Sequence, residues 1–220
     1  LVTMQSREAA CLGAAILVLA GLFVYVYVDA VTPTKGAKIA SYDRPRAALL
    51  VIDIQEDYTG TTAKPPLPHK NAARLIDTVN RTIDRAAAKD VLVVYVRQEY
   101  GEWARFIPGA AAIKGTPGSM IDARVRRVST HEFPKKIGDA FSNPELEALL
   151  VANRVDRVYL VGLDLEFCVH STARGALNRG YTVTVLTDAV ALLNEEKRDA
   201  LLKEYREEGV HLIESAAFGG

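Results

Sequence analysis

Apolar runs of strand length alternate with helical patterns from Ala47 to the end of the chain. The apolar runs predict strands at Ala47–Ile54, Val91–Arg97, His131–Lys136, Val155–Leu163, Thr182–Ala189 and Val210–Ser215. Patterns near helical spacing lie between them, at Asn71–Asp90, Pro144–Asn153, Cys168–Asn178 and Asn194–Gly209. Apolar strands that alternate with helices are typical of a parallel sheet covered on both faces. We therefore predict a doubly wound α/β domain over residues 46–220, with a mainly parallel sheet of about six strands and helices on both faces.

The N-terminal segment contains a long uncharged, apolar stretch. Ala9–Val28 is a stretch of about twenty uncharged residues, which as a helix would be about 30 Å long, the thickness of a bilayer core. Tyr25 and Tyr27 near its end suit the membrane interface. We predict a retained single-pass anchor over residues 1–30 and a short tether over residues 31–45, with the domain in the cytoplasm because basic residues follow the segment. A cleaved signal peptide followed by export is the alternative.

The overall composition narrows the classes of partner. The chain has 27 Lys and Arg residues against 27 Asp and Glu residues, so its net charge is zero at pH 7. Without a basic excess, we expect no nucleic-acid partner. The two cysteines, Cys11 and Cys168, are not expected to form a disulfide, because Cys11 lies in the apolar N-terminal stretch.

Reactive side chains lie at the ends of predicted strands. Asp53 ends the first strand, and Lys135 and Lys136 end a short one. Cys168 lies between an apolar run and a helical pattern, where a helix N-terminus favours the thiolate. The carboxyl ends of parallel strands meet in one crevice, so these groups can lie together.

Each of these residues also has an ordinary interpretation. A free cysteine is usually a small buried hydrophobe, and a lysine pair is usually a solvated surface feature. Asp53 could be a turn residue at a strand end. A magnesium phosphatase of the haloacid-dehalogenase kind is disfavoured, because Gln55 stands where that motif has its second aspartate.

Four stretches together resemble the isochorismatase-like cysteine hydrolases, which include nicotinamidases and N-carbamoyl amide hydrolases. They are ALLVIDIQEDY (Ala48–Tyr58), KGTPGS (Lys114–Ser119), which resembles the family's GTPG turn and is given that name below, KKIGDAF (Lys135–Phe141) and the nucleophile segment Val158–Ala189. The resemblance covers about residues 46–216, and its specificity comes from the four motifs occurring in this order.

The resemblance implies a catalytic triad of Asp53, Lys135 and Cys168. In the family's lysine motif the lysine stands six residues before a phenylalanine, here Phe141, which selects Lys135 over Lys136. Asp53 would accept the thiol proton, Cys168 would attack an amide-like carbon, and water would hydrolyse the resulting thioester.

The resemblance also implies features of the backbone near the nucleophile. A cis peptide bond is expected between Leu163 and Asp164, with Gly162 giving the turn steric room. The backbone N–H groups of Asp164 and Cys168 would form the oxyanion hole. Asp164 itself stands where the family usually has a small apolar residue.

Departures from the family pattern limit the chemistry. Metal-binding nicotinamidases carry histidines after the second strand, whereas RQEYGEW (Arg97–Trp103) has none, so we expect no metal and no cofactor. True isochorismatases of the siderophore and phenazine pathways lack the cysteine. Cys168 therefore argues for attack on a carbonyl carbon rather than cleavage of a vinyl ether.

These observations predict a hydrolase of the C–N bond in a small amide- or ureide-like substrate. We expect Gln55, Trp103 and Phe106 to contact that substrate. Tyr100, Trp103 and Phe106 could wall the pocket, since aromatic residues on long loops often do, although their spacing of three also suits packing of a helical turn. The expected partners are the small molecule, a lipid bilayer through the N-terminal helix, and further copies of the chain in a homo-oligomer. The alternative function is a membrane-anchored scaffold or binding protein that keeps the fold without the chemistry.

Overall fold

The computed structural model describes residues 32–63 and 71–219. The anchor predicted over residues 1–30 lies outside the described residues. Within the two described ranges, no helix combines the length and the apolar character that crossing a bilayer requires.

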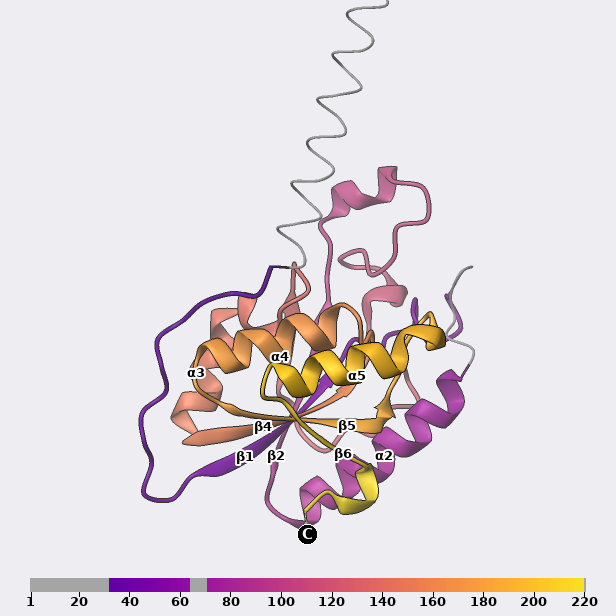
Figure 1. Ribbon diagram of the computed structural model, residues 1–220. Helices are drawn as coiled ribbons and strands as arrows, with labels where there is room; N and C mark the ends of the chain where they lie inside the picture. The colour runs from indigo at the N-terminus through magenta and orange to yellow at the C-terminus, as the bar shows by residue number, and fades with distance from the viewer. Residues whose placement is uncertain (1–31, 64–70, 220) are drawn as a thin grey trace, which may run out of the picture.

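A single six-stranded parallel sheet forms the centre of the domain (Figure 1). Its strands lie in the order β3-β2-β1-β4-β5-β6. Their bounds are β1 (Arg46–Ile52), β2 (Leu92–Gln98), β3 (Glu132–Lys135), β4 (Val155–Gly162), β5 (Thr182–Val190) and β6 (His211–Ile213). The predicted parallel sheet of about six strands is therefore confirmed.

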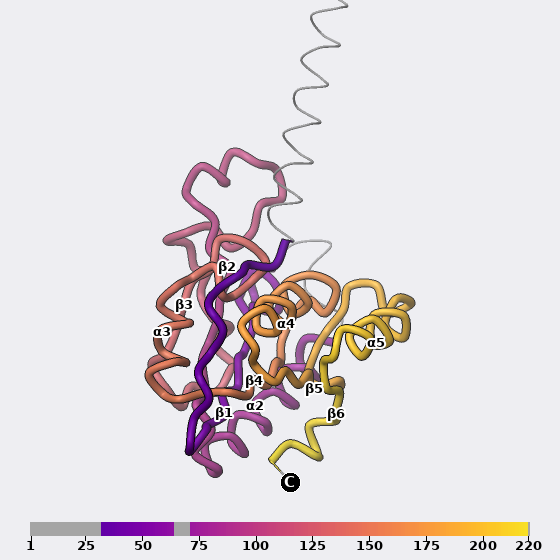
Figure 2. The backbone as a smooth tube through the Cα atoms, turned by 60° about the vertical axis from the view of Figure 1, so that its left-hand side comes forward, coloured from indigo at the N-terminus to yellow at the C-terminus, as the bar shows by residue number. Residues whose placement is uncertain are grey.

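Helices cover both faces of the sheet (Figures 1 and 2). They are α2 (Ala72–Ala88), α3 (Pro144–Ala152), α4 (Cys168–Asn178) and α5 (Arg198–Glu207). Alternate residues of β1 point to opposite faces: Leu50 packs in the cluster with α3, α4 and α5, and Leu49 in the cluster with α2. The helices predicted from the apolar spacing are all present. Within the described ranges, short 3₁₀ segments occur in the loops at Glu102–Phe106, Pro117–Ser119, Ala140–Ser142 and Glu195–Lys197, and after β6 at Ser215–Ala217.

The strand order creates a crevice between β1 and β4. The chain adds β2 and β3 on one side of β1 and then returns to add β4 on the other side. At such a switch point the loops leaving the two strands diverge, and ligands bind outside the carboxyl ends. β1 ends next to Asp53, and β4 ends next to the segment that leads to Cys168.

Gly162 allows β1 and β4 to approach closely at this point. Its φ is +117°, and a Cβ atom there would lie 2.0 Å from the carbonyl oxygen of Ile52. No side chain fits such a contact, so glycine is required by both the backbone angle and the space.

Residues 32–45, which we call the strap, contain no helix or strand but are held against the domain. Asp139 Oδ2 accepts a hydrogen bond from the Thr34 N–H at 2.8 Å, and the Asn178 side chain donates to the Thr34 carbonyl at 2.9 Å. The Ile39 N–H donates to the Arg179 carbonyl at 2.8 Å. The segment predicted as a short tether therefore makes hydrogen bonds to the C-terminal end of α4 and to the loop after β3.

Candidate active site

Asp53 follows β1 directly and is almost fully buried, with 2% of its surface exposed. Its φ is +54°, a left-handed conformation that is uncommon for a residue other than glycine. The Asp53 N–H donates to the Val96 carbonyl of β2 at 2.8 Å, which fixes this turn. Among the described residues, its Oδ1 atom is buried and lacks a hydrogen-bond partner. A buried carboxylate with an unused lone pair is placed to accept a proton.

Lys135, the last residue of β3, connects the carboxylate and the thiol. Its Nζ atom lies 2.9 Å from Asp53 Oδ2 and donates to Cys168 Sγ at 3.2 Å. It also donates to Gln98 Oε1 at 2.6 Å and to the Ile137 carbonyl at 3.3 Å. Burial by itself lowers the pKa of Lys135, but the neighbouring Asp53 and Cys168 outweigh this effect and keep the lysine charged.

Cys168 is the first residue of α4 and is partly exposed. Burial raises its pKa to about 12; the positive charge of Lys135 opposes that shift and the negative charge of Asp53 adds to it. A helix N-terminus was expected to favour the thiolate, but burial of the sulfur acts against it and raises the pKa, so the thiol is the form expected at neutral pH.

A pocket of about 350 Å³ opens over these residues. Its walls combine apolar and aromatic residues with a few polar ones. The lining residues are Asp53, Tyr58, Gln98, Tyr100, Gly109, Ala111, Leu163, Asp164, Phe167, Cys168 and Leu193. A volume of this size suits a small molecule. Within this described lining there is no arginine, lysine or histidine, whereas two residues are acidic.

Gln55 was expected to contact substrate, but its side chain binds the protein backbone instead. It is fully buried, and its amide binds backbone: Oε1 accepts from the Gln98 N–H at 2.7 Å, and Nε2 donates to the carbonyls of Gln98 and Ser119. The Gln55 side chain therefore joins the ends of β1 and β2 to the GTPG turn instead of facing the pocket. It holds Gln98, whose side chain accepts the Lys135 hydrogen bond.

Trp103 and Phe106 do not line the pocket either. They are 62% and 82% exposed, on the 3₁₀ segment of the loop after β2. Tyr100, the third aromatic residue considered for the pocket wall, does line the pocket, together with Tyr58. Burial raises the pKa of both phenols, so they stay neutral. The sequence signal for Tyr100 was its position just after a strand, which Trp103 and Phe106 lack.

Gln98 was missed by sequence reasoning, although a polar residue that ends a buried strand was a usable signal. It is 3% exposed, and its Nε2 donates to the Lys135 carbonyl at 3.2 Å while its Oε1 accepts from Lys135 Nζ. This double contact fixes both the backbone and the side chain of the lysine.

The Leu163–Asp164 peptide bond is cis, as expected. The Asp164 carboxylate accepts hydrogen bonds from the N–H groups of Glu166 at 2.7 Å and Leu193 at 2.9 Å. Asp164 thus joins the turn before α4 to the loop after β5. These hydrogen bonds explain structurally why an aspartate stands where the family usually has a small apolar residue. The Cys168 N–H lies in the first turn of α4, where N–H groups lack partners within the helix and can bind an oxyanion.

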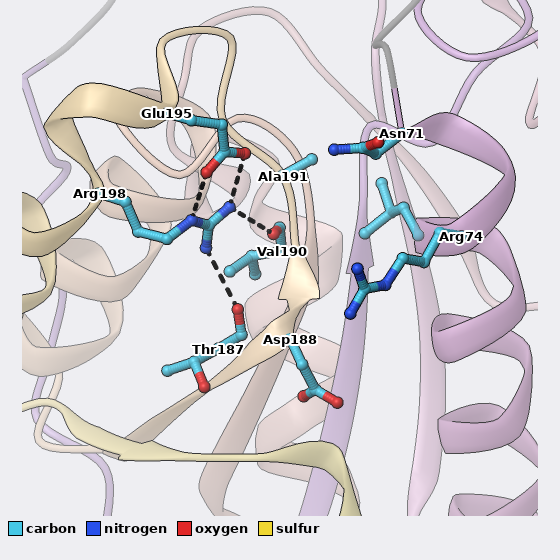
Figure 3. A pocket seen from close by; sticks show the side chains of 9 residues that line it. Asn71, Arg74, Thr187, Asp188, Val190, Ala191, Glu195 and Arg198 are labelled. Atoms are coloured by element: carbon cyan, nitrogen blue, oxygen red, sulfur yellow. Dashed lines mark hydrogen bonds and ion pairs between the residues drawn. The ribbon is translucent and has the colours of Figure 1, made fainter.

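A second hollow, of about 280 Å³, lies between α2 and the end of β5 (Figure 3). Arg198 projects into it and is held by Glu195 and by the carbonyls of Thr187 and Val190. None of the three triad residues lines this hollow, so the predicted chemistry does not belong there.

The described residues do not fit a metal at the triad. In the part of the chain that the structure describes, one group of three possible ligands occurs, His170, Glu204 and Glu208, none of which lines the active-site pocket. The Arg174 guanidinium pairs with both glutamates, and His170 Nε2 lies 2.8 Å from Glu208. The cluster is already neutralised by protein groups.

Several curated proteins are similar to this chain in sequence. Nicotinamidase 3 of Arabidopsis thaliana is 30% identical over 168 residues, which cover 71% of this chain and 78% of the relative. Streptothricin hydrolase of Streptomyces noursei is 34% identical over 146 residues, which cover 66% of this chain but only 49% of the relative. A maleamate amidohydrolase of Pseudomonas putida is also similar. These relatives are hydrolases of C–N bonds, in agreement with the predicted enzyme class.

The fold is shared with solved structures. The N-carbamoylsarcosine amidase from Thermoplasma acidophilum superposes with a TM-score of 0.67 and 28% sequence identity, covering 80% of this chain and 99% of that one. Residues 47–217 match the isochorismatase domain. This chain therefore belongs to the isochorismatase family of hydrolases.

Proposed function

We propose that this protein is a cysteine amidohydrolase that cleaves the C–N bond of a small amide through a thioester on Cys168. One observation carries the proposal. A single buried ammonium, Lys135 Nζ, lies 2.9 Å from the Asp53 carboxylate and 3.2 Å from the Cys168 sulfur at the base of a small pocket. This arrangement provides a base, a nucleophile and a fixed positive charge within reach of one substrate carbon.

The first half of the reaction forms the thioester. The Cys168 thiol gives its proton to Asp53 while the sulfur attacks the amide carbon, and Lys135 stabilises the negative charge on sulfur as it develops. The Cys168 N–H at the start of α4 stabilises the oxyanion. The tetrahedral intermediate collapses, the C–N bond breaks, and the nitrogen leaves with the proton that Asp53 had accepted.

The second half releases the acid. Water enters the position that the amine has left, Asp53 takes one of its protons, and the hydroxide attacks the thioester carbon. The C–S bond breaks, and the sulfur recovers its proton from Asp53. Each group then returns to its starting state, so a buried thiol with a raised pKa is a suitable resting form.

The charges around the pocket favour a neutral substrate. The described lining includes Asp53 and Asp164 and lacks any arginine, lysine or histidine, so a carboxylate on the substrate would meet no partner and would face acidic groups. Tyr100, Phe167 and Leu193 instead offer apolar contact to the body of the substrate. Uncharged primary amides with a compact apolar part fit best.

The test is release of ammonia from a panel of matched amides that differ only in whether they carry a carboxylate. We expect turnover of neutral members, a mass increase on Cys168 in quenched reactions, and no turnover by Cys168→Ala. A panel without any turnover by the wild-type domain, together with unmodified Cys168, would favour the scaffold alternative. Preference for the carboxylate-bearing members would contradict the substrate class alone.

We further propose that residues 1–30 anchor the protein to a membrane, with the domain on the cytoplasmic side. The uncharged stretch Ala9–Val28 supports this, and so do the basic residues that follow it. The full-length protein should stay in the membrane after high-salt extraction, and a reporter at the C-terminus should be active in the cytoplasm. Soluble protein that begins near Val31 would instead indicate signal-peptide cleavage.

A further inference from the structure

An apolar lobe rises from the end of the molecule at which the described chain begins. The lobe comprises residues 100–114 and is closed at its base by pairing of Tyr100 with Ile113 and by the hydrogen bonds Tyr100 N to Ala112 O and Lys114 N to Tyr100 O. In Figures 1 and 2, which differ by a turn about the vertical axis, the lobe and the start of the strap both lie at the upper end.

The tip of the lobe exposes large apolar side chains. Trp103, Phe106 and Ile107 are 62%, 82% and 50% exposed, while Ala104 between them is buried. The neighbouring charges, Glu102 and Arg105, pair with each other at 3.2 Å. An exposed cluster of this kind on a folded domain marks an interaction surface, and tryptophan in particular is enriched at the interface of a bilayer with water.

The strap limits where a membrane can lie. The uncharged stretch ends at Val28, four residues before Thr32, and four extended residues span at most about 14 Å. Two residues later the chain is fixed, because Thr34 accepts hydrogen bonds from Asn178 and Arg179 and donates to Asp139. A bilayer that holds the uncharged stretch would therefore lie close to Thr34, near the upper end of the domain.

The charges on the strap are consistent with the same orientation. The strap contains three basic residues, Lys35, Lys38 and Arg44, against one acidic residue, Asp43, and all four are exposed. Basic residues close to a membrane surface are attracted by anionic headgroups.

We propose that the tip of the lobe, Trp103, Phe106 and Ile107, inserts into the interface of the lipid bilayer to which the N-terminal segment is anchored. This inference rests on the proposed anchor and not on the proposed chemistry. The lobe also carries Tyr100, Gly109 and Ala111 of the pocket wall, so the contact places the substrate pocket beside the membrane surface.

Trp103 is the only tryptophan of the chain, so its fluorescence reports on the lobe alone. The full-length protein is reconstituted into phosphatidylcholine–phosphatidylserine vesicles, with and without bromine on the acyl chains near the headgroups, and flotation first establishes that it is bound. We expect brominated lipid to lower Trp103 emission about twofold. The Phe106→Ser, Ile107→Ser double variant should lose most of this quenching, whereas the control Val151→Ser, an exposed site on α3, should keep it.

Cys168→Ala should be quenched like the wild type, which separates this test from the test of the chemistry. Emission that brominated lipid leaves unchanged while soluble acrylamide quenches it would overturn the proposal. So would a blue-shifted emission without lipid quenching that grows with the ratio of protein to lipid, because it would indicate that a second copy of the chain covers the lobe. Failure of the full-length protein to float with the vesicles would contradict both the proposed anchor and the proposed insertion of the lobe.

Discussion

The two hollows of the domain hold their charges in opposite ways. In the hollow between α2 and β5, Arg198 is paired with Glu195, and both oxygens of Asp188 accept hydrogen bonds from Ser215. The Arg198 and Glu195 side chains are 25% and 49% exposed, so water shares in their solvation. Every acceptor named here has its own donor, and the arrangement is that of a stable surface.

In the active-site pocket the charges are buried and shared unequally. The Lys135 and Asp53 side chains are 0% and 3% exposed. One ammonium serves four acceptors, and one carboxylate oxygen has no described hydrogen-bond partner. This unequal sharing leaves Asp53 Oδ1 available to accept the thiol proton. The difference between the two hollows is therefore that only the active-site pocket combines a buried ion pair with an unpartnered carboxylate oxygen and a thiol.

The largest expected effect comes from removing the free acceptor. Asp53→Asn keeps the shape of the side chain but cannot take the thiol proton, so turnover should fall by about 10³-fold or more. Arg198→Met in the other hollow should change turnover less than about twofold, since Arg198 contacts no triad residue. Steady-state ammonia release measures both. Equal losses in the two variants would remove the distinction between the hollows.

The next effect is on stability. Lys135→Met leaves the Asp53 charge buried without its partner and should lower the free energy of unfolding by about 3–5 kcal/mol. Arg198→Met leaves Glu195 half exposed and should cost no more than about 1 kcal/mol. Denaturant titration of both variants gives the difference, with Lys136→Ala, an exposed lysine, as the mild control. A small cost for Lys135→Met would mean that Asp53 is better hydrated than its burial indicates.

The reactivity of the thiol should depend on pH in a characteristic way. Because the pKa of Cys168 is raised to about 12 from a free-thiol value near ~8.5, alkylation by iodoacetamide at neutral pH should be about 10²-fold slower than for a free cysteine. The rate should still rise above pH 9, where a free thiol has levelled off. A plateau near pH 9 would contradict the burial argument. The Asp53→Asn variant, which lacks the negative charge, should react faster.

The smallest effect concerns the second contact of the lysine. Gln98→Leu removes one of four acceptors of Lys135 Nζ while leaving the backbone that Gln55 binds, so kcat should fall about tenfold with little change in KM. Gln98→Glu keeps an oxygen at this position and should retain more activity. An increase in KM without loss of kcat would mean that Gln98 binds substrate and does not position the lysine.

Much of the fold could be predicted because its signals are local. Continuous apolar runs such as Val91–Arg97 identify buried strands, and strand ends then place Asp53, Lys135 and Cys168 near one crevice. These residues lie together because the sheet brings its carboxyl ends to a common edge. The pattern left Lys135 and Lys136 as alternatives, and the resemblance to the family selected Lys135.

The rest of the site depends on packing that no local pattern reports. Trp103 and Phe106 were expected in the pocket, but the fold of their loop turns them outward. Gln55 was expected to face substrate, but its amide pairs with the backbone of β2 and of the GTPG turn. The thiol was expected to be acidic, but burial of the sulfur raises its pKa. In each case a neighbour far away in the sequence decides the outcome.

The order of the strands has a consequence for when activity can arise during synthesis. Asp53, Lys135 and Cys168 come from three segments separated by more than thirty residues each, and β1 receives β4 on its open side only after the whole β2–β3 half is complete. A ribosome-bound chain that ends before α4 therefore has an incomplete pocket floor and lacks the nucleophile Cys168. The enzyme has no active fragment to release early, and the appearance of amidase activity would time the closure of the sheet on a nascent chain.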